Sequence, residues 1–265
     1  MNRPYARYAE IYDRTGQDRF GAAMTNITLK YLQGRGAIIS SAIDLACGTG
    51  SAAIALARHE IAVTGIDLEP AMLSKARINA IAEGCDIDFR LGDMRRFGSR
   101  TQVDLIVCFF DSLNYLSDKE DLNACFSSVA ACLQDGGWFV FDLNTNKRLA
   151  TDWSDSTFVA YDEDDLLCLV RSSYDAGENR SPLVLTTFQR ESDSENRWTR
   201  WDEEHIAYAY PLDQIEERLK IARFKVIERY AIDDAPMTVS GPGSEESGRV
   251  LYIAQLTPGI GESPQ

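Results

Sequence analysis

Short apolar runs alternate with segments of helical spacing between residues 37 and 143. Short apolar runs predict five strands, at residues 37–45, 61–67, 86–91, 103–109 and 137–143. Two segments with helical spacing lie between them: one begins at Pro70 and ends at Gly84, and the other begins at residue 118 and ends at a pair of glycines. Strands that alternate with helices typically form a parallel sheet that is covered on both faces. The pattern therefore predicts an α/β fold.

The pattern changes after residue 155, where polar and apolar residues alternate one by one. The segments LLCLVRSSYD, LVLTTFQRES and RWTRWDEEHIAYAY predict the strands of an antiparallel meander. A helix at 211–222, a strand at 224–232, a flexible stretch through residue 248 and a closing strand RVLYIAQL follow. Two strands that are joined without a crossover helix must be antiparallel if they are neighbours. We expect one domain over residues 1–265, with an inserted antiparallel subdomain at 155–210.

Length and charge narrow the classes of function. The chain has 265 residues and a formal net charge of −14, with no basic block. A field of this sign opposes approach to nucleic acid and to anionic membranes. No stretch reaches the roughly 18 apolar residues of a membrane span, and the N-terminus lacks the apolar region of a signal peptide. We expect a cytoplasmic protein, and the six cysteines, which show no paired metal spacing, indicate neither disulfides nor a zinc site.

A glycine-rich turn follows the first predicted strand, in the segment AIDLACGTGSAAIALA at residues 42–57. Gly48, Gly50 and Ala53 match the dinucleotide fingerprint, which would place a pyrophosphate at the helix N-terminus. A tight strand-to-helix turn without a ligand would select glycine as well. The only charged side chain in this segment is that of Asp44, whereas a pyrophosphate site would gain from a cation. The turn therefore favours a positive or zwitterionic ligand.

Acidic residues also follow the next two predicted strands. Asp67 could accept two hydrogen bonds from a ribose diol while Leu68 packs on a base, although a carboxylate at this position also occurs in nicotinamide sites. Asp93 could accept a hydrogen bond from an exocyclic amine, and Met94 offers a polarizable contact beside it. Open α/β sheets bind their ligands at this carboxyl edge. We expect one nucleoside-containing ligand to lie across the three strand ends.

Five motifs occur in order: DLACGTG, GIDLEPAML, GDMRRF, DLIVCFFDSLNYL and LQDGGWFVFDLNT. With them, the sequence resembles the class I S-adenosylmethionine-dependent methyltransferases over about residues 37–143 and the terminal hairpin. The resemblance implies a Rossmann-like, mostly parallel sheet of seven strands in the order 3-2-1-4-5-7-6, with the last strand antiparallel and with the meander inserted. It also implies that the glycine turn holds the methionine part of S-adenosyl-L-methionine, with S-adenosyl-L-homocysteine as the product.

The resemblance places the methionine part at Ala46, Gly48 and Gly50, the ribose at Asp67, and the adenine at Asp93 and Met94, and further candidates complete the set of expected cofactor contacts. The full set is Tyr12, Arg19, Ala46, Gly48, Gly50, Asp67, Leu68, Met72, Asp93, Met94 and Phe109. Tyr8 and Tyr12 stand one helical turn apart and could cover the cofactor, or only anchor the first helix. Arg19 could reach the cofactor carboxylate, or form an exposed salt bridge.

A proton acceptor is expected near the methyl group. Transfer from a sulfonium mainly requires alignment and exclusion of water, with no metal, but an amine or hydroxyl acceptor must lose a proton. The candidates are Tyr12, Asp111, Tyr115, Asp142 and His205. By resemblance Asp111 and Tyr115 face the methyl group, although Asp111 could instead cap the next turn. His205 lies among carboxylates that would raise its basicity, or it is an ordinary surface histidine.

A closer resemblance concerns the substrate. The combination of YAEIYD, FFDSLNYL and an inserted meander looks like the small-molecule branch that includes bacterial N-methyltransferases of sugars and amines. We expect methyl transfer to a nitrogen or oxygen of a small molecule, with the meander over the substrate and able to form a homodimer contact. The alternatives are a catalytically silent S-adenosylmethionine-binding partner or regulatory protein, a nicotinamide-dependent oxidoreductase and an RNA methyltransferase. Trp198, Trp201, Tyr208 and Tyr210 could wall the substrate pocket, or pack a half-buried strand.

Overall fold

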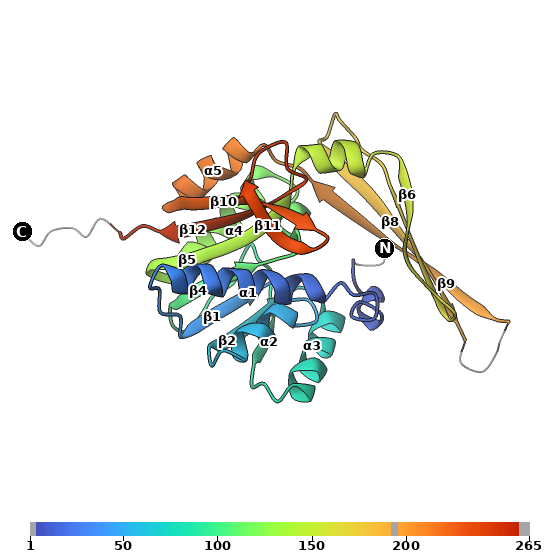
Figure 1. Cartoon of the computed structure of the whole chain (residues 1–265), viewed down its shortest axis with the longest axis horizontal. Coiled ribbons are helices and arrows are strands. Elements are labelled where there is room, and N and C mark those ends of the chain that lie inside the picture. Colours follow the sequence, from blue (N-terminus) through green and yellow to red (C-terminus); the bar gives the residue numbers. More distant parts are fainter. Residues whose placement is uncertain (1–3, 192–195, 260–265) are drawn as a thin grey trace, which may run out of the picture.

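A central sheet of eight strands organises the molecule (Figure 1), in a computed structural model that describes residues 4–191 and 196–259. Five parallel strands form one part of it: β1 (Ser41–Leu45), β2 (Ala62–Asp67), β3 (Asp88–Leu91), β4 (Val103–Cys108) and β5 (Leu133–Asn144). Three antiparallel strands complete it: β10 (Phe224–Asp234), β11 (Met237–Pro242) and β12 (Arg249–Leu256). The order is β11-β10-β12-β5-β4-β1-β2-β3.

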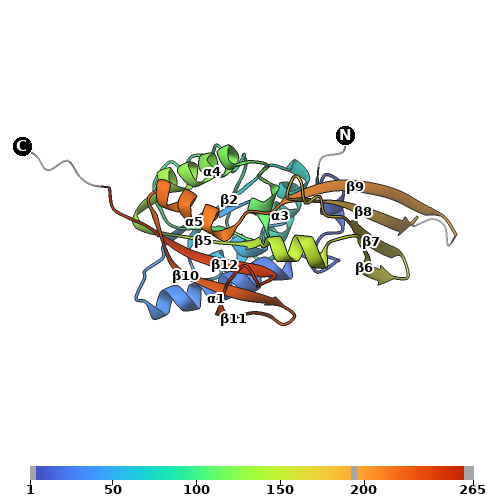
Figure 2. The same cartoon turned by 90° about the horizontal axis from the view of Figure 1, so that it is seen from above.

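Five helices cover the two faces of this sheet: α1 (Arg19–Gly34), α2 (Ser51–Ala57), α3 (Pro70–Ala82), α4 (Lys119–Cys132) and α5 (Leu212–Ile221). Buried side chains of α1, α2 and α3 form one core cluster with the sheet, and those of α4 and α5 form the other. The edge-on view in Figure 2 shows α1 and α4 on opposite sides. Burial of side chains such as Met24 and Phe126 stabilises each layer by about 1.5 to 3 kcal/mol per residue. The main sheet is therefore covered by helices on both of its faces.

A second sheet has four antiparallel strands in sequential order: β6 (Ser156–Glu163), β7 (Leu166–Ser172), β8 (Arg180–Arg190) and β9 (Trp198–Tyr208). It extends away from the main sheet beyond the carboxyl edge (Figure 1). The chain also has three single helical turns: η1 (Tyr8–Glu10) before α1, η2 (Ser112–Tyr115) between β4 and α4, and η3 (Arg148–Asp152), which lies on the connection between the two sheets. Among the described helices, none is long and apolar enough to cross a membrane.

The predicted fold class is confirmed, with two differences in detail. If β12 and β10 are counted as strands 7 and 6, the predicted order 3-2-1-4-5-7-6 is present, and β11 adds an eighth strand at the edge. The prediction of a flexible stretch from residue 233 through residue 248 is therefore wrong for residues 237–242, which form β11. Ile232 of β10 pairs with Val239 of β11 in a hairpin. The meander has a fourth strand, β6, at its edge. Most side chains of β6 are exposed, so its sequence lacks the alternation of polar and apolar residues that predicts strands.

Candidate active site

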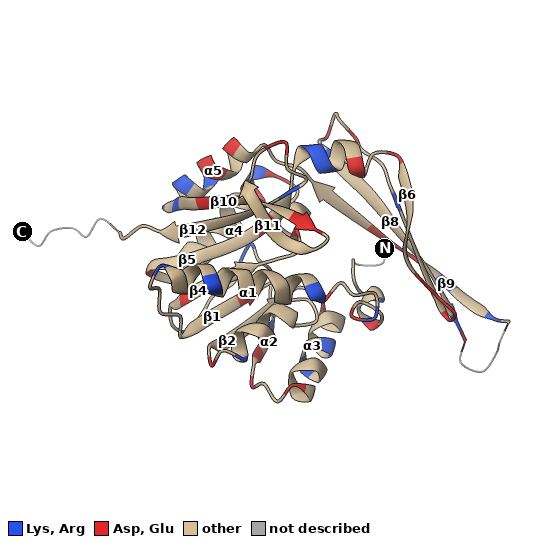
Figure 3. Ribbon diagram, viewed as in Figure 1, with Lys and Arg blue, Asp and Glu red and all other residues tan. Residues whose placement is uncertain are grey.

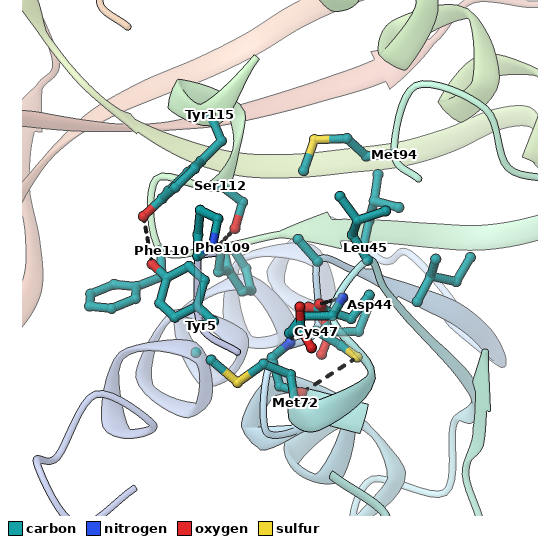
Figure 4. Close-up of a pocket in the computed structure, with 18 of the residues that line it drawn as sticks. Tyr5, Asp44, Leu45, Cys47, Met72, Met94, Phe109, Phe110, Ser112 and Tyr115 are labelled. Atoms are coloured by element: carbon teal, nitrogen blue, oxygen red, sulfur yellow. Dashed lines mark hydrogen bonds between the residues drawn. The ribbon is translucent and has the colours of Figure 1, made fainter. Parts of the chain in front are cut away.

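A cavity of about 480 Å³ lies at the carboxyl ends of β1, β2 and β4. Its walls come from the glycine turn, the start of α3, the loop after β3 and the segment after β4. Nine of the predicted cofactor residues line it: Tyr12, Ala46, Gly48, Asp67, Leu68, Met72, Asp93, Met94 and Phe109. Figure 4 shows Met72 and Met94 on opposite sides of this cavity. Residues from separate strands thus meet at the edge where the sequence places a ligand.

The glycine turn bends through left-handed backbone at Ala46 (φ 58°), Gly48 (φ 53°) and Gly50 (φ 87°). A Cβ atom added to Gly48 would meet no atom within 4 Å, so this position is open toward the cavity. A Cβ atom on Gly50 would lie 3.1 Å from Phe89, and Gly50 does not line the cavity. Gly48 therefore leaves room for close approach of a ligand, whereas Gly50 serves the turn and its packing.

Asp67 holds the turn against the end of β2. Its Oδ2 accepts a hydrogen bond from the Gly48 N–H at 2.8 Å, and its Oδ1 accepts one from the Glu69 N–H at 2.8 Å. Burial raises the pKa of this carboxyl, and the backbone hydrogen bonds oppose that shift. Each oxygen keeps a second lone pair for a ligand hydroxyl. Beside it, Leu68 is 61% exposed at the cavity rim, where a flat base could cover it.

Asp93 has a partner that the sequence analysis did not include. Arg95 donates hydrogen bonds to both carboxylate oxygens of Asp93, from Nη2 to Oδ2 at 2.6 Å and from Nε to Oδ1 at 3.0 Å, and also contacts Asp121 at 3.2 Å. The hydrogen bonds from Arg95 hold the pKa of Asp93 below its usual range. Asp93, Arg95 and Asp121 all line the cavity. The motif GDMRRF contains both Arg95 and Arg96, but the sequence alone does not show which of the two arginines bonds Asp93.

Asp44 contributes a buried carboxyl group to the same cavity (Figure 4). Its Oδ2 accepts a hydrogen bond from the Ala53 N–H at 2.9 Å, and burial raises the pKa of Asp44 to about 8. Among the described lining residues, Arg95 is the only lysine or arginine. Arg19 lies elsewhere, beside Gly16, and lines neither this cavity nor the one described next. The lining suits a ligand with a cationic group near Asp44 and a nucleoside toward Asp67 and Asp93.

A second cavity of about 350 Å³ lies between the main sheet and the four-stranded sheet. Five residues line both cavities, namely Tyr5, Tyr12, Gln17, Phe110 and Tyr115. Apolar side chains of β6, β7 and β8 form one side, including Phe158, Val170 and Leu183. Charged residues Asp111, Arg148, Asp234 and Arg249 line the same cavity. A shared, largely aromatic wall therefore separates two compartments.

Hydrogen bonds link this wall to β9. The Tyr5 and Tyr115 hydroxyl oxygens lie 2.8 Å apart (Figure 4), and the Tyr115 hydroxyl lies 2.8 Å from His205 Nδ1. His205 is 3% exposed and its Nε2 lies 3.6 Å from Glu203 Oε2. Burial raises the pKa of both Tyr5 and Tyr115, so both phenols are neutral donors at ordinary pH. His205 is thus no surface histidine, and the structure joins it to Tyr115, another predicted candidate.

The two aspartates after β4 and in β5 are placed differently. Asp111 lines the second cavity, and its Oδ1 accepts a hydrogen bond from Arg249 Nη2 at 2.9 Å. Its side chain makes no capping hydrogen bond to the turn that follows. Asp142 is fully buried and lines neither cavity, because it accepts hydrogen bonds from Phe110 N at 2.6 Å, from Asp111 N at 3.0 Å and from Arg249 Nη1 at 3.2 Å. Asp142 therefore lies beneath the site and holds its floor.

The aromatic residues near the end of the meander lie apart from both cavities. Trp198, Trp201, Tyr208 and Tyr210 line neither of them. Trp201 is buried, with the Arg7 guanidinium 4.1 Å from its ring, and the Tyr210 hydroxyl donates a hydrogen bond to the Leu116 carbonyl. Packing accounts for these two side chains.

The sheet order, the glycine turn that opens onto a cavity, and the carboxylate at the end of β2 define a class I S-adenosylmethionine-dependent methyltransferase. Residues 42–137 match the family model described as a methyltransferase domain. A protein of Geobacillus sp. (strain WCH70) named "putative methyltransferase" is 31% identical over 95% of this chain and 99% of its own length. "Putative methyltransferase YqeM" of Bacillus subtilis (strain 168) is 33% identical over 95% and 96%. The chain belongs to this methyltransferase family.

Two further comparisons extend this picture. A crystal structure of an S-adenosylmethionine-dependent methyltransferase from Clostridium acetobutylicum has the same fold, with a TM-score of 0.80, 24% identity, and coverage of 97% of this chain and 100% of that one. The dTDP-3-amino-3,4,6-trideoxy-alpha-D-glucopyranose N,N-dimethyltransferase of Streptomyces venezuelae is 30% identical over 51% of this chain and 56% of its own length. The protein is a methyltransferase that uses S-adenosylmethionine.

Proposed function

We propose that this methyltransferase transfers the methyl group of S-adenosylmethionine to a nitrogen or oxygen atom of a small molecule that occupies the second cavity. The observation that carries the proposal is the wall of five residues shared by the two cavities. A methyl donor on one side and an acceptor on the other would meet at this wall. When bound, the cofactor supplies a methyl group on a sulfonium, which is already activated toward displacement.

On the cofactor side, the proposal assigns the ribose to Asp67, the adenine to the region of Leu68, Asp93 and Met94, and the methionine part to the glycine turn. Asp67 keeps free lone pairs beside the turn, and Asp44 places a carboxyl under the same loop. Asp93 would exchange some of its contact with Arg95 for a hydrogen bond from adenine. Tyr12 belongs to the shared wall and would contact both ligands.

The second cavity fits a compact acceptor. About 350 Å³ lies within the range of small-molecule pockets, and apolar residues on one side face charged residues on the other. Arg148 and Asp234 form an ion pair with each other, and Arg249 contacts Asp111. An acceptor with an apolar body and one or two polar groups suits this lining. The amino-sugar methyltransferase similarity supports such a substrate.

The four-stranded sheet has two roles in this proposal. As an inserted subdomain at residues 155–210, it closes the acceptor cavity. Its outer face also presents Leu167 and Leu169, which alternate with buried Leu166 and Cys168 and could pack against a second subunit. Sedimentation velocity tests the homodimer, and a monomer at every concentration would contradict it.

Binding of nucleic acid is disfavoured because the net charge is −14. Figure 3 shows Lys and Arg mixed with Asp and Glu, as on α5.

The test is transfer of a labelled methyl group from S-adenosylmethionine to panels of amines, amino sugars, phenols and RNA. The proposal predicts label on at least one small amine or hydroxyl compound and none on RNA. Calorimetry with S-adenosylmethionine and with nicotinamide dinucleotides accompanies the assay. Cofactor binding without turnover on any acceptor would instead support a silent binding protein, and that result would contradict the proposal.

A further inference from the structure

Glu203 of β9 is a buried carboxylate that holds the N-terminal segment. Three backbone N–H groups donate to it, from Tyr5 at 2.8 Å, Arg7 at 2.7 Å and Tyr8 at 2.9 Å. The Glu203 residue is 1% exposed. Burial alone would raise its pKa, but the nearby His205 imidazole and the hydrogen bonds from these backbone groups keep the pKa below its usual range. Glu203 is therefore an anion that the N-terminal segment satisfies.

The segment held by Glu203 covers both cavities. We call residues 4–12 the strap, and Pro4, Tyr5 and Tyr12 from it line the first cavity. Tyr5, Tyr8 and Tyr12 also line the second cavity. The strap has little other regular structure, since it contains only the single turn η1. One side chain from the four-stranded sheet thus fixes a cover over the cofactor site and the acceptor site.

The same carboxylate faces the imidazole of His205. Glu203 Oε2 lies 3.6 Å from His205 Nε2, which has no hydrogen-bond partner among the described residues. A negative charge at this place favours the tautomer with the proton on Nε2 and leaves Nδ1 as an acceptor for the Tyr115 hydroxyl at 2.8 Å. The other groups near the imidazole are the phenol of Tyr5 and, across the second cavity, Asp111. The arginines of that cavity are paired with carboxylates.

We infer that Glu203 is a positioning residue that closes the strap over the cofactor and at the same time prepares His205 to accept a proton through Tyr115. This inference rests on the proposed function and adds Tyr5 and Glu203 to the residues that the sequence suggested. Tyr5 and Glu203 are 198 positions apart in the sequence, and the fold brings them into contact.

The proton path follows the hydrogen bonds. As the acceptor atom bonds to the methyl carbon, the carbon–sulfur bond breaks and its electron pair stays on sulfur as a neutral thioether. The proton of the acceptor atom passes to the Tyr115 oxygen while the Tyr115 hydroxyl proton passes to His205 Nδ1. The resulting imidazolium is stabilised by Glu203 and later releases its proton to solvent. No other reactant is needed.

Nuclear magnetic resonance of the ¹⁵N-histidine-labelled protein with saturating S-adenosylhomocysteine tests the tautomer without any acceptor substrate. The chain has two histidines, and His59 is exposed, so a His59→Gln variant assigns both signals. We expect neutral His205 to carry its proton on Nε2. The Glu203→Gln variant should shift neutral His205 toward the tautomer with the proton on Nδ1, because the neighbouring negative charge is lost. A proton on Nδ1 in the wild type, or an unchanged tautomer in this variant, would overturn the inference.

Stopped-flow release of S-adenosylhomocysteine tests the strap. Glu203→Gln should release it about tenfold faster, corresponding to about one hydrogen bond to a charged group. The matched control is Glu204→Gln, which removes a neighbouring carboxylate that is exposed on the opposite face of β9. Equal release rates in the wild type and in Glu203→Gln would refute the coupling to the strap.

Turnover adds a third readout once an acceptor is known. Glu203→Gln should lower kcat about tenfold to a hundredfold, with a smaller change in KM. If that variant does not fold, Tyr115→Phe retains the ring and should lower kcat to a similar extent. Wild-type kcat in a folded Tyr115→Phe protein would exclude the proton path. Failure of the wild type to methylate any acceptor would refute the proposed function. The magnetic resonance experiment needs no acceptor, so it would still test whether Glu203 sets the tautomer of His205.

Discussion

The buried carboxyl of Asp44 makes a quantitative prediction about cofactor binding. Burial, with a smaller contribution from nearby Asp67, raises its pKa to about 8 in the free protein. About nine in ten Asp44 side chains are then protonated at about pH 7. A cofactor with a net positive charge favours the carboxylate, so binding should expel this proton. The sign follows directly: affinity for S-adenosylmethionine rises as the pH rises toward 8 and then levels off.

The magnitude follows from the same pKa. If only the carboxylate form binds well, affinity increases about tenfold between about pH 7 and about pH 9, and binding at about pH 7 releases about 0.9 proton. Calorimetry in buffers with different ionisation enthalpies measures the released proton directly. The Asp44→Asn variant should lose both effects, while Asp86→Asn, an exposed control, should keep them. Titration of the cofactor itself is common to all three proteins and cancels in the comparison.

Two results would refute this reasoning. One is equal proton release by the wild type and by a folded Asp44→Asn variant, and the other is an affinity that falls between about pH 7 and about pH 9. The free protein offers a check of its own. Because the folded pKa of Asp44 is raised, its contribution to stability is present at low pH and is lost as the pH rises through about 8.

Three further substitutions have expected outcomes. Asp67→Ala should weaken S-adenosylmethionine binding about tenfold to a hundredfold for each lost hydrogen bond, as measured by calorimetry, and normal affinity would remove the ribose assignment. Asp142→Ala leaves Arg249 buried with one partner fewer, so urea denaturation should show about 3 to 5 kcal/mol of lost stability. A loss below about 0.5 kcal/mol would mean that the floor does not depend on Asp142. Gly50→Ala should cost about 1 to 3 kcal/mol of stability in thermal denaturation because Gly50 has φ 87°, whereas Gly34→Ala, which meets nothing, should not.

The parallel half of the fold could be predicted because its strands are buried and its helices have clear ends. β4 is buried at every position, and α3 begins at Pro70 as the sequence indicates. β6 and β11 could not be predicted in this way. Both are edge strands with mostly exposed side chains, so neither shows the alternation that burial on one face imposes.

Some residues of the candidate site could also be predicted from the sequence, and others could not. Asp67 and Asp93 could be placed because the carboxyl ends of neighbouring parallel strands meet at one edge. Asp111 and Asp142 looked equivalent for that reason, but the direction of each side chain differs, and Asp142 is directed to buried backbone N–H groups. Glu203 was missed because its partners lie at the other end of the chain, and only the folded structure brings them together.

Filling the acceptor cavity tests the central claim most directly. Ala160 of β6 lines the second cavity and not the first, so Ala160→Trp should block the acceptor and leave the cofactor site open. Its neighbour Val159 is 57% exposed, and Val159→Trp is the matched control. The account predicts that Ala160→Trp binds S-adenosylmethionine with affinity within about threefold of the wild type and loses at least about a hundredfold in methyl transfer. Wild-type transfer by a folded Ala160→Trp protein would contradict the claim that the acceptor occupies this cavity.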